Sequence, residues 1–168
     1  SNPSENYEVT FQAGYPNIVD MDNVRGHAAG AMIFLHYKTG ECDLIREIIR
    51  LSKDATNGVR VAVCHNLSYL EKSNRKLFLK ITKRYSKDKD IAVCLGLIPV
   101  VTDTMETYGV KYISIIKNLI KAINENTEHI ADELIDKIVK LAMKENDKHF
   151  LSLLSYLTDD KSVKPLVK

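Results

Sequence analysis

The chain contains few of the residues that interrupt helices. Its 168 residues include 7 Gly, 4 Pro and no Trp, so long stretches are free of the strongest helix breakers. No apolar run reaches about 18 residues, the length that a helix needs to cross a bilayer. No secretory signal peptide is visible either. We therefore expect a largely helical chain with no membrane-spanning segment.

Cysteine content and charge give no sign of a special environment. Of the three cysteines, Cys64 and Cys94 fall on predicted buried faces, where a free cysteine behaves as a small hydrophobe. A reduced, cytoplasmic protein is the expectation. The net charge of +2 provides no overall attraction to nucleic acid or to a membrane. The length favours one domain with a sizeable core.

No catalytic, cofactor or metal motif is present in the sequence. The cysteines and histidines lack the spacing of a structural zinc site. Cys64 and His65 are neighbours, so on a helix they point to different faces and suit neither one metal ion nor a nucleophile and its base. There is no glycine-rich loop followed by Lys-Ser or Lys-Thr, and hence no ATP site. We expect no enzymatic activity and no cofactor.

The chain does contain an internal repeat. Val59–Leu70 reads VRVAVCHNLSYL, and Val24–Leu35, 35 residues earlier, reads VRGHAAGAMIFL. A weaker copy follows, in which Ala92–Cys94 repeats Ala62–Cys64. Self-similarity at such a period indicates a helical repeat array. Each helical pair buries its apolar face by stacking on the next.

Hydrophobic periodicity predicts an all-α fold along most of the chain. We expect a right-handed α-solenoid of roughly seven to nine helices in antiparallel pairs. Residues 1–20 should form an extended arm, 21–157 a single helical-repeat domain and 158–168 a frayed tail. The start at Ser1-Asn2, without an initiator Met, is typical of an expression or processing scar, so we expect the chain to be a piece of a longer protein.

Two expectations concern particular helices. The first helix should begin near Met21, because Val24, Ala28, Ala31 or Met32 and Leu35 recur at helical spacing. Its small residues should let a neighbouring helix approach closely. Val59–Leu70 should be one helix.

The following helices carry their own signals. Ser73 is the expected cap of the next helix, and Pro99 should end or kink a later helix near Leu97. The expected inward residues of the helix after Ser73 are Leu77, Phe78, Ile81 and Tyr85.

The repeated segment resembles a known family. Val59–Val63 with Leu67 and Leu70 resembles the second-helix portion of HEAT repeats, which belong to the armadillo-like superhelices, and Val24-Arg25 is similar. The resemblance covers about residues 20–101 and implies a ladder of structural ion pairs. It implies that Asp20 or Asp22 pairs with Arg60 and that Arg25 pairs with an upstream repeat, with Asp54 as the other candidate acid. The implied ladder residues are Asp20, Asp22, Arg25, Asp54 and Arg60.

A second resemblance is narrower. Asn23–Ala29, which reads NVRGHAA, resembles a motif in the helical-repeat C-terminal regions of very large bacterial ATPases, some of them implicated in antiviral defence. It implies a bacterial parent chain whose ATPase lies elsewhere in that chain.

One stretch of the sequence is strongly basic. Its lysines step by three or four residues and so share one helical face. Such a row suits phosphate groups or an acidic protein, although a solvated outer face has the same appearance, and no aromatic residues interleave for base stacking. The stretch comprises Lys72, Arg75, Lys76, Lys80, Lys83, Arg84 and Lys87. Three tyrosines are candidate interface aromatics: Tyr108, Tyr112 and Tyr156.

The resulting hypothesis is a non-catalytic scaffold that binds a protein partner or another domain of its parent chain. The alternative is nucleic-acid binding through the basic stretch at 72–89. An enzyme is the weakest reading, because a HEAT-like glycosylase would need a carboxylate and aromatic residues beside the basic stretch. The sequence does not specify the partner, the face that is used or the oligomeric state.

Overall fold

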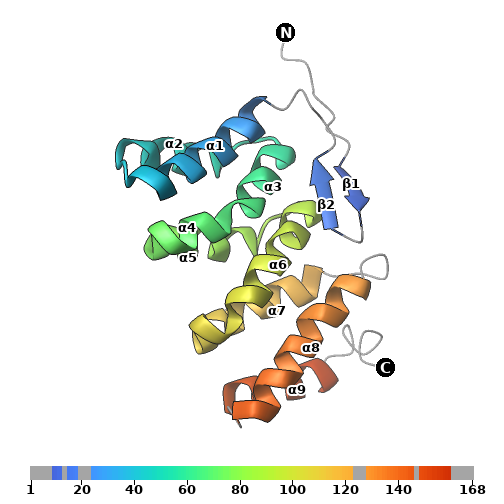
Figure 1. Cartoon of the computed structure of the whole chain (residues 1–168). Coiled ribbons are helices and arrows are strands. Elements are labelled where there is room, and N and C mark those ends of the chain that lie inside the picture. Colours follow the sequence, from blue (N-terminus) through green and yellow to red (C-terminus); the bar gives the residue numbers. More distant parts are fainter. Residues whose placement is uncertain (1–8, 13–14, 19–23, 123–127, 146–147, 160–168) are drawn as a thin grey trace.

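The computed structural model describes residues 9–12, 15–18, 24–122, 128–145 and 148–159. Within these ranges the fold is all-α, apart from one two-stranded hairpin (Figure 1). The elements in chain order are β1 Val9–Gln12, β2 Tyr15–Ile18, α1 Val24–Thr39, α2 Asp43–Leu51, α3 Asn57–His65, α4 Leu67–Ser73, α5 Arg75–Tyr85, α6 Ile91–Tyr108, η1 Gly109–Tyr112, α7 Ile113–Ala122, α8 Glu128–Glu145 and α9 Lys148–Asp159.

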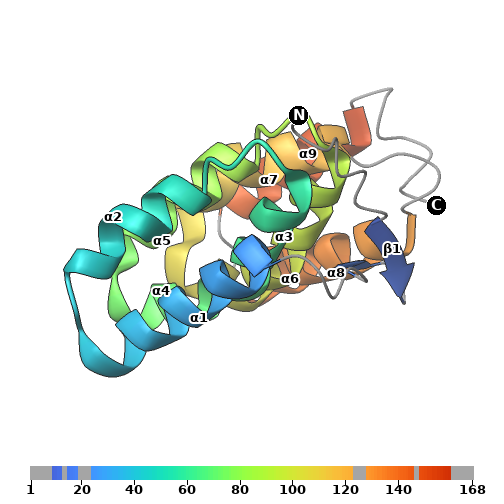
Figure 2. The same ribbon diagram turned by 90° about the horizontal axis from the view of Figure 1, so that it is seen from above.

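The helices lie in two layers, which Figure 2 shows side by side. In the first layer α1, α3, α6 and α8 follow one another, each in contact with the next, and α4 continues from α3. The second layer holds α2, α5, α7 and α9. Each second-layer helix packs on the first-layer helix that precedes it in the chain. The chain therefore builds successive helical pairs along one direction (Figure 1).

The core lies where a helix has neighbours on both sides. Helix α3 contacts α1 on one side and α6 on the other, and β2 contacts both α3 and α6. The predicted stripe of Val59, Val63, Leu67 and Leu70 is fully buried. A helix that is sandwiched in this way is apolar on more than one face, as the sequence indicated.

Helix α1 packs through a different face from the one that its periodic stripe marks. Gly26, Ala29 and Ile33 are buried, whereas Val24 and Leu35 are 74% and 45% exposed. The periodic stripe of Val24 and Leu35, from which the helix was predicted, therefore lies on its exposed side. Periodicity identifies a helix but does not choose between two apolar sides, and here the side with the smaller residues packs against α3.

The small residues of α1 do permit a close approach. A Cβ atom at Gly30 would lie only 2.9 Å from Nδ2 of Asn66. Asn66 stands between α3 and α4, with φ −107° and ψ 2°, so Val59–Leu70 forms two helices and not one. The Asn66 side chain donates to the Ala62 carbonyl at 2.8 Å. The expected single helix is thus broken where α1 comes closest.

In the next segment the predicted cap was wrong, and one of the two outcomes predicted at Pro99, an end of the helix, does not occur. Ser73 is the last residue of α4, and the cap of α5 is Asn74, whose Oδ1 accepts from the Leu77 amide at 3.1 Å. Pro99 does not end its helix, because α6 continues to Tyr108 and stops at Gly109, with φ +45°. A proline inside a helix costs about 3 kcal/mol, and the near-complete burial of α6 offsets that cost.

The N-terminal arm is partly a hairpin. β1 pairs antiparallel with β2, with Val9 opposite Ile18 and Phe11 opposite Pro16. An extended arm was expected, because a strand near Val9 had no evident partner in the sequence. Since β1 does have a partner, that prediction was wrong for this part of the arm. The partner strand was not predicted because it contains Pro16, and proline cannot donate in a ladder and is tolerated only at a sheet edge. In a two-stranded sheet both strands are edges.

One stretch is apolar enough to be compared with a membrane span. Ile91–Ala122 meets the length and composition of a spanning helix, with a mean hydropathy of 1.3 in its best window. Most of that window is buried inside the fold, and Gly109 interrupts the α-helix. The apolar character follows from its place between α3 and α8, and composition alone is weak evidence for a membrane span.

Candidate interaction surfaces

The first-layer loops are joined by Arg60. Its guanidinium forms two bonds with the carboxylate of Asp88, at 3.0 Å from Nε to Oδ2 and 3.1 Å from Nη2 to Oδ1. Its Nη1 donates to the carbonyls of Asp54 and Ala55, at 2.7 and 2.9 Å. The Arg60 and Asp88 side chains are each only 15% exposed. This planar, bidentate geometry is the strong form of an arginine–carboxylate pair.

Arg25 makes the equivalent contact one repeat earlier. Its Nη1 lies 3.5 Å from Oδ2 of Asp54, and its Nη2 donates to the Thr56 hydroxyl at 2.9 Å. Asp54 and Asp88 also hold the same local turn, because each accepts the backbone amide two residues later, Thr56 and Asp90, at 2.9 and 3.0 Å. The two loops are structural copies.

The ladder therefore runs in the opposite direction to the one implied by the resemblance. Arg60 reaches forward to Asp88 and Arg25 forward to Asp54, whereas Arg60 was expected to reach back to Asp20 or Asp22. Those two residues lie outside the described part of the chain. Arg25, Asp54 and Arg60 do form ion pairs, and Asp54, the other candidate acid, pairs with an arginine of the neighbouring repeat. The partners expected for the two arginines were wrong, because the sequence alone does not show which loop lies beside which arginine in space.

A second ladder joins the ends of the second-layer helices. Nη2 of Arg84 donates to both the carbonyl and the hydroxyl of Ser52, the latter at 2.6 Å. One repeat later, Nδ2 of Asn118 donates to the Ser86 hydroxyl at 3.2 Å. Ser52 and Ser86 are both buried and both follow the last residue of their helix. These bonds satisfy polar groups at buried helix ends.

Sequence reasoning missed this second ladder, although a signal was present. The segment 50–54 reads RLSKD and the segment 84–88 reads RYSKD, 34 residues later. A repeat of Arg-x-Ser-Lys-Asp places the serine and the aspartate of both ladders at once. The repeat is visible at this spacing, whereas the Val-Arg pairs mark only the first ladder.

The basic stretch divides into structural and exposed residues. Arg84 is half-buried, bonds to Ser52 and lies over the Tyr85 ring, so it belongs to the ladder. Arg75 pairs with Glu71 at 3.4 Å. The remaining lysines are exposed and form no ion pair within the described ranges. They are Lys72 on α4, Lys76, Lys80 and Lys83 on α5, and Lys87 in the turn after it.

Exposed lysines also recur at one position of successive repeats. Lys53, Lys87 and Lys121 are each 34 residues apart, and all three are exposed at or just beyond the ends of α2, α5 and α7. Together with Lys76, Lys80 and Lys83 of α5 they form what we call the basic surface. Its residues belong to α5 and α7 or to the turns that follow α2 and α5, and Figure 2 shows α2, α5 and α7 in the second layer. This extension of the stretch at 72–89 was not foreseen.

Two of the three candidate interface tyrosines lie in the core. Tyr108 and Tyr112 are core residues whose rings stack at 5.0 Å. The Tyr108 hydroxyl donates to Oε1 of Glu71 at 3.0 Å, and burial together with this bond raises the pKa of Tyr108 to about 12. Tyr156 is half-buried beneath Lys117, whose Nζ lies 4.6 Å from the ring centroid. The expectation that Tyr108 and Tyr112 are interface aromatics was wrong, because both are buried.

A different aromatic cluster lies at the surface. The ring of Phe34, which is 42% exposed, lies 5.3 Å from that of Tyr69, and Tyr37 lies 5.4 Å from the same ring. Nζ of Lys38 stands 5.4 Å above the Phe34 ring. Sequence reasoning missed this cluster, although Phe34 and Tyr37 are three residues apart and so share a helix face.

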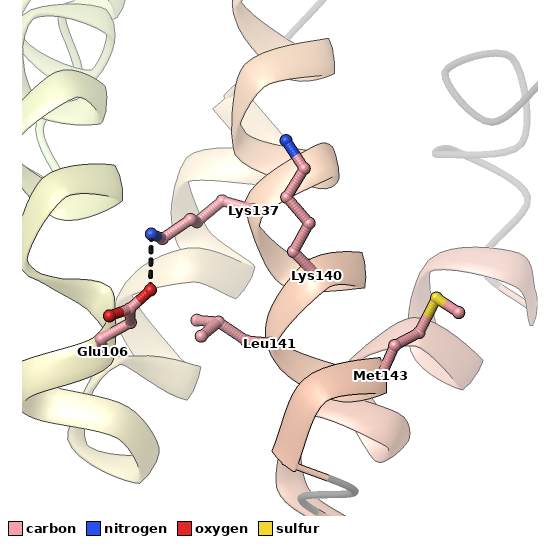
Figure 3. A pocket seen from close by; sticks show the side chains of 5 residues that line it. All are labelled: Glu106, Lys137, Lys140, Leu141 and Met143. Carbon is pink, nitrogen blue, oxygen red and sulfur yellow. Dashed lines mark hydrogen bonds and ion pairs between the residues drawn. The ribbon is translucent and has the colours of Figure 1, made fainter.

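Two grooves lie between neighbouring first-layer helices. The first, of about 280 Å³, separates α3–α4 from α6. Its walls are formed by Cys64, His65, Ser68, Gly96, Pro99, Val100 and Asp103. The second, of about 540 Å³, separates α6 from α8 and is lined by Glu106, Lys137, Lys140, Leu141 and Met143. Figure 3 shows Lys137 reaching across this second groove to Glu106, and the two charged atoms are 2.8 Å apart.

The buried thiols are unsuited to nucleophilic chemistry. Burial raises the pKa of Cys64 well above its ordinary value, and burial with the nearby Asp88 carboxylate raises that of Cys94 to about 11. Their sulfurs donate weakly to the carbonyls of Val93 and Tyr85. A reactive cysteine needs a lowered pKa. Among the described residues, no group of three or more His, Cys, Asp or Glu side chains could hold a metal ion.

The comparisons with known proteins add no relative. No family model, no curated protein and no solved structure matches the chain. The likeness to HEAT repeats and to the large bacterial ATPases therefore depends on the residues of this chain alone.

Proposed function

We propose that the chain is a right-handed α-solenoid of the HEAT or armadillo type and serves as a non-catalytic scaffold for a protein partner. The stacked pairs and the two ladders support the solenoid, because each repeat contacts its neighbours and repeats the same joints. The partner is a separate protein or another domain of a longer parent chain. A reduced, cytoplasmic setting suits the three free cysteines.

The observation that carries the proposal is the pair of first-layer grooves. Both flank α6, so Asp103 at the rim of one groove and Glu106 at the rim of the other are one turn apart on the same helix. Apolar side chains such as Val100 and Leu141 lie between charged rims. A face with an apolar floor and a polar rim is typical of protein interfaces, and repetition along the stack suits an extended segment.

Site-specific photocrosslinking in cells or lysate tests this proposal. A photoreactive amino acid replaces Ser68 in the first groove or Met143 in the second, and Lys83 on the basic surface is the matched control position. We expect one protein to crosslink at both groove positions and not at Lys83. The purified partner should then bind Ser68→Arg at least 10-fold more weakly, while the Tm of the variant stays unchanged. Crosslinks confined to Lys83 would refute the scaffold function of the grooves.

Nucleic-acid binding is the second candidate, and the basic surface favours it. Six exposed lysines on successive helices can neutralise phosphates and release counterions. If about four of them contact phosphates, a fourfold rise in salt should weaken binding by roughly 10²-fold. The absence of stacking aromatics among these lysines favours a duplex over a single strand.

Fluorescence anisotropy separates the two candidates. Labelled duplex DNA, duplex RNA and single strands are titrated at about 50 and 200 mM salt, as the counterion-release argument requires. Lys76→Glu and Lys83→Glu should each abolish most of the binding, while Lys140→Glu on the opposite layer serves as a control of equal charge change. Equal losses in all three variants, or no binding at low salt, would rule out a phosphate site on the basic surface.

A further inference from the structure

The outward side of α1 is an apolar face with no helix on it within the described part of the chain. Its residues recur at helical spacing on the side opposite Gly26, Ala29 and Ile33, which pack inward. Val24, Phe34 and Leu35 are among the most exposed large hydrophobic side chains described. The outward side comprises Val24, Ala28, Ala31 and Leu35, with the exposed His27 and Lys38 beside them. Phe34 lies at its edge, where its ring meets that of Tyr69 on α4.

The repeat shows what normally covers these positions. Val24, Ala28 and Leu35 align with Val59, Val63 and Leu70, 35 residues later. Those three residues are fully buried, because α3 lies between α1 and α6 and α4 lies between α1 and α5. Equivalent positions are thus occupied by core residues in one repeat and by surface residues in the repeat before it.

The covering element must have particular properties. Helix α1 packs on α3 through small and medium apolar residues, and the close approach at Gly30 requires a thin helix. The first-layer series of α1 on α3, α3 on α6 and α6 on α8 continues geometrically past α1. A terminal repeat that ends a solenoid in water normally presents a polar outer face, whereas this one exposes Val24 and Leu35, at 74% and 45%.

We propose that the outward face of α1 binds a further helical pair of the same repeat type, whose first helix packs on α1 as α1 packs on α3. This inference rests on the repeat architecture of the proposed scaffold and is independent of partner binding in the grooves. The surface aromatic cluster of Phe34, Tyr37 and Tyr69 lies at one end of this face and extends the contact. Aromatic side chains at such a position are typical of interface hot spots.

The test adds one repeat to the full chain. Residues 1–58 are joined to residues 24–168, so that a second copy of 24–58 precedes α1 through the same loop that normally precedes Val59. The background carries Cys42→Ser, because Cys42 is the exposed native thiol and Cys64 and Cys94 are buried. Ala31→Cys is introduced in either the first or the second copy, and the rate of maleimide labelling is measured.

We expect labelling of the second copy to be at least 10-fold slower than labelling of the first copy, which should match the unextended chain. A cysteine at Lys83 should label equally fast in both chains. Equal, fast labelling of both copies would overturn the proposal, whether or not the added repeat folds. Slow labelling in the unextended chain that depends on protein concentration would also overturn it, because the occupant would then be a second copy of the chain. Groove crosslinking in the unextended chain remains a separate test of the scaffold.

Discussion

The pairing of Arg60 with Asp88 should contribute much more to stability than the equivalent pairing of Arg25 with Asp54. Arg60 makes two bonds to the Asp88 carboxylate and two to backbone carbonyls, and both side chains are largely buried. Removing one partner of a buried pair typically costs 3–5 kcal/mol. Because this pair keeps some contact with water, we expect Asp88→Ala to lower the free energy of unfolding by about 3 kcal/mol.

The Arg25 pair provides a matched comparison within the same chain. Arg25 is 51% exposed and its closest carboxylate contact is 3.5 Å. Exposed pairs contribute about 0.2–1 kcal/mol, so Arg25→Ala should cost less than about 1 kcal/mol. The Arg25 pair should also weaken in 0.5 M salt, whereas the Arg60 pair should be screened much less.

Urea unfolding at pH 7, followed by circular dichroism, measures both pairs in a double-mutant cycle. The single variants Arg60→Ala and Asp88→Ala are combined, and the interaction energy is compared with that of Arg25 and Asp54. We expect about 2 kcal/mol for the first pair and at most about 0.5 kcal/mol for the second. Equal interaction energies would refute the argument that burial and bidentate geometry make the first-layer ladder stabilising.

Three further predictions concern other joints of the fold. Arg84→Ala should lower the free energy of unfolding by about 2 kcal/mol, because it leaves the buried helix end after α2 without a donor, while the adjacent Lys83→Ala changes it by less than about 0.5 kcal/mol; similar urea midpoints would contradict this. Gly30→Ala should lower the Tm, because the new Cβ would meet Asn66 at 2.9 Å, although alanine normally stabilises a helix by about 1 kcal/mol; a raised Tm would contradict it. Burial raises the pKa of Cys94 from 9.0 to about 11, so the folded state holds this proton more tightly. The protonated Cys94 thiol contributes to the free energy of unfolding in full below pH 9. This contribution, at most about 3 kcal/mol, is lost as the pH rises towards 11. In Tm measurements from pH 7 to 11, Cys94→Ala should reduce this alkaline loss, and an unchanged profile would contradict the assignment.

The sequence predicted the helices well where burial is strongest. The inward residues of α5 were correctly placed at Leu77, Phe78, Ile81 and Tyr85, because a helix with one apolar face allows a single arrangement. The sequence of α1 is compatible with two arrangements, because Val24 and Leu35 form one apolar stripe and Gly26, Ala29 and Ile33 form another. Which stripe is buried depends on how closely α3 approaches, and a local pattern does not contain that information.

The ladders show the same limit for the candidate surfaces. Arg25 and Arg60 were recognised as ladder residues, but the direction of the ladder depends on which loop lies beside which helix start. Arg84 appeared to be one charge of a basic row, yet it is bonded to Ser52, 32 residues away. A surface of free cations therefore has to be separated from structural cations by their partners, which only the three-dimensional arrangement supplies.

The ladders also determine where the molecule should bend. Between α1 and α6 the first-layer loops are joined by the half-exposed pair of Arg25 and Asp54 and by the largely buried, bidentate pair of Arg60 and Asp88. The second-layer helix ends are joined by serine-centred bonds that extend to α7. Between α6 and α8 the charged joint in the described ranges is the partly exposed pair of Lys137 and Glu106. We therefore expect the stack of helices to be stiff from α3 to α6 and to bend most easily between α6 and α8. Under tension α8 and α9 should separate first, and the 540 Å³ groove should change width more than the 280 Å³ groove.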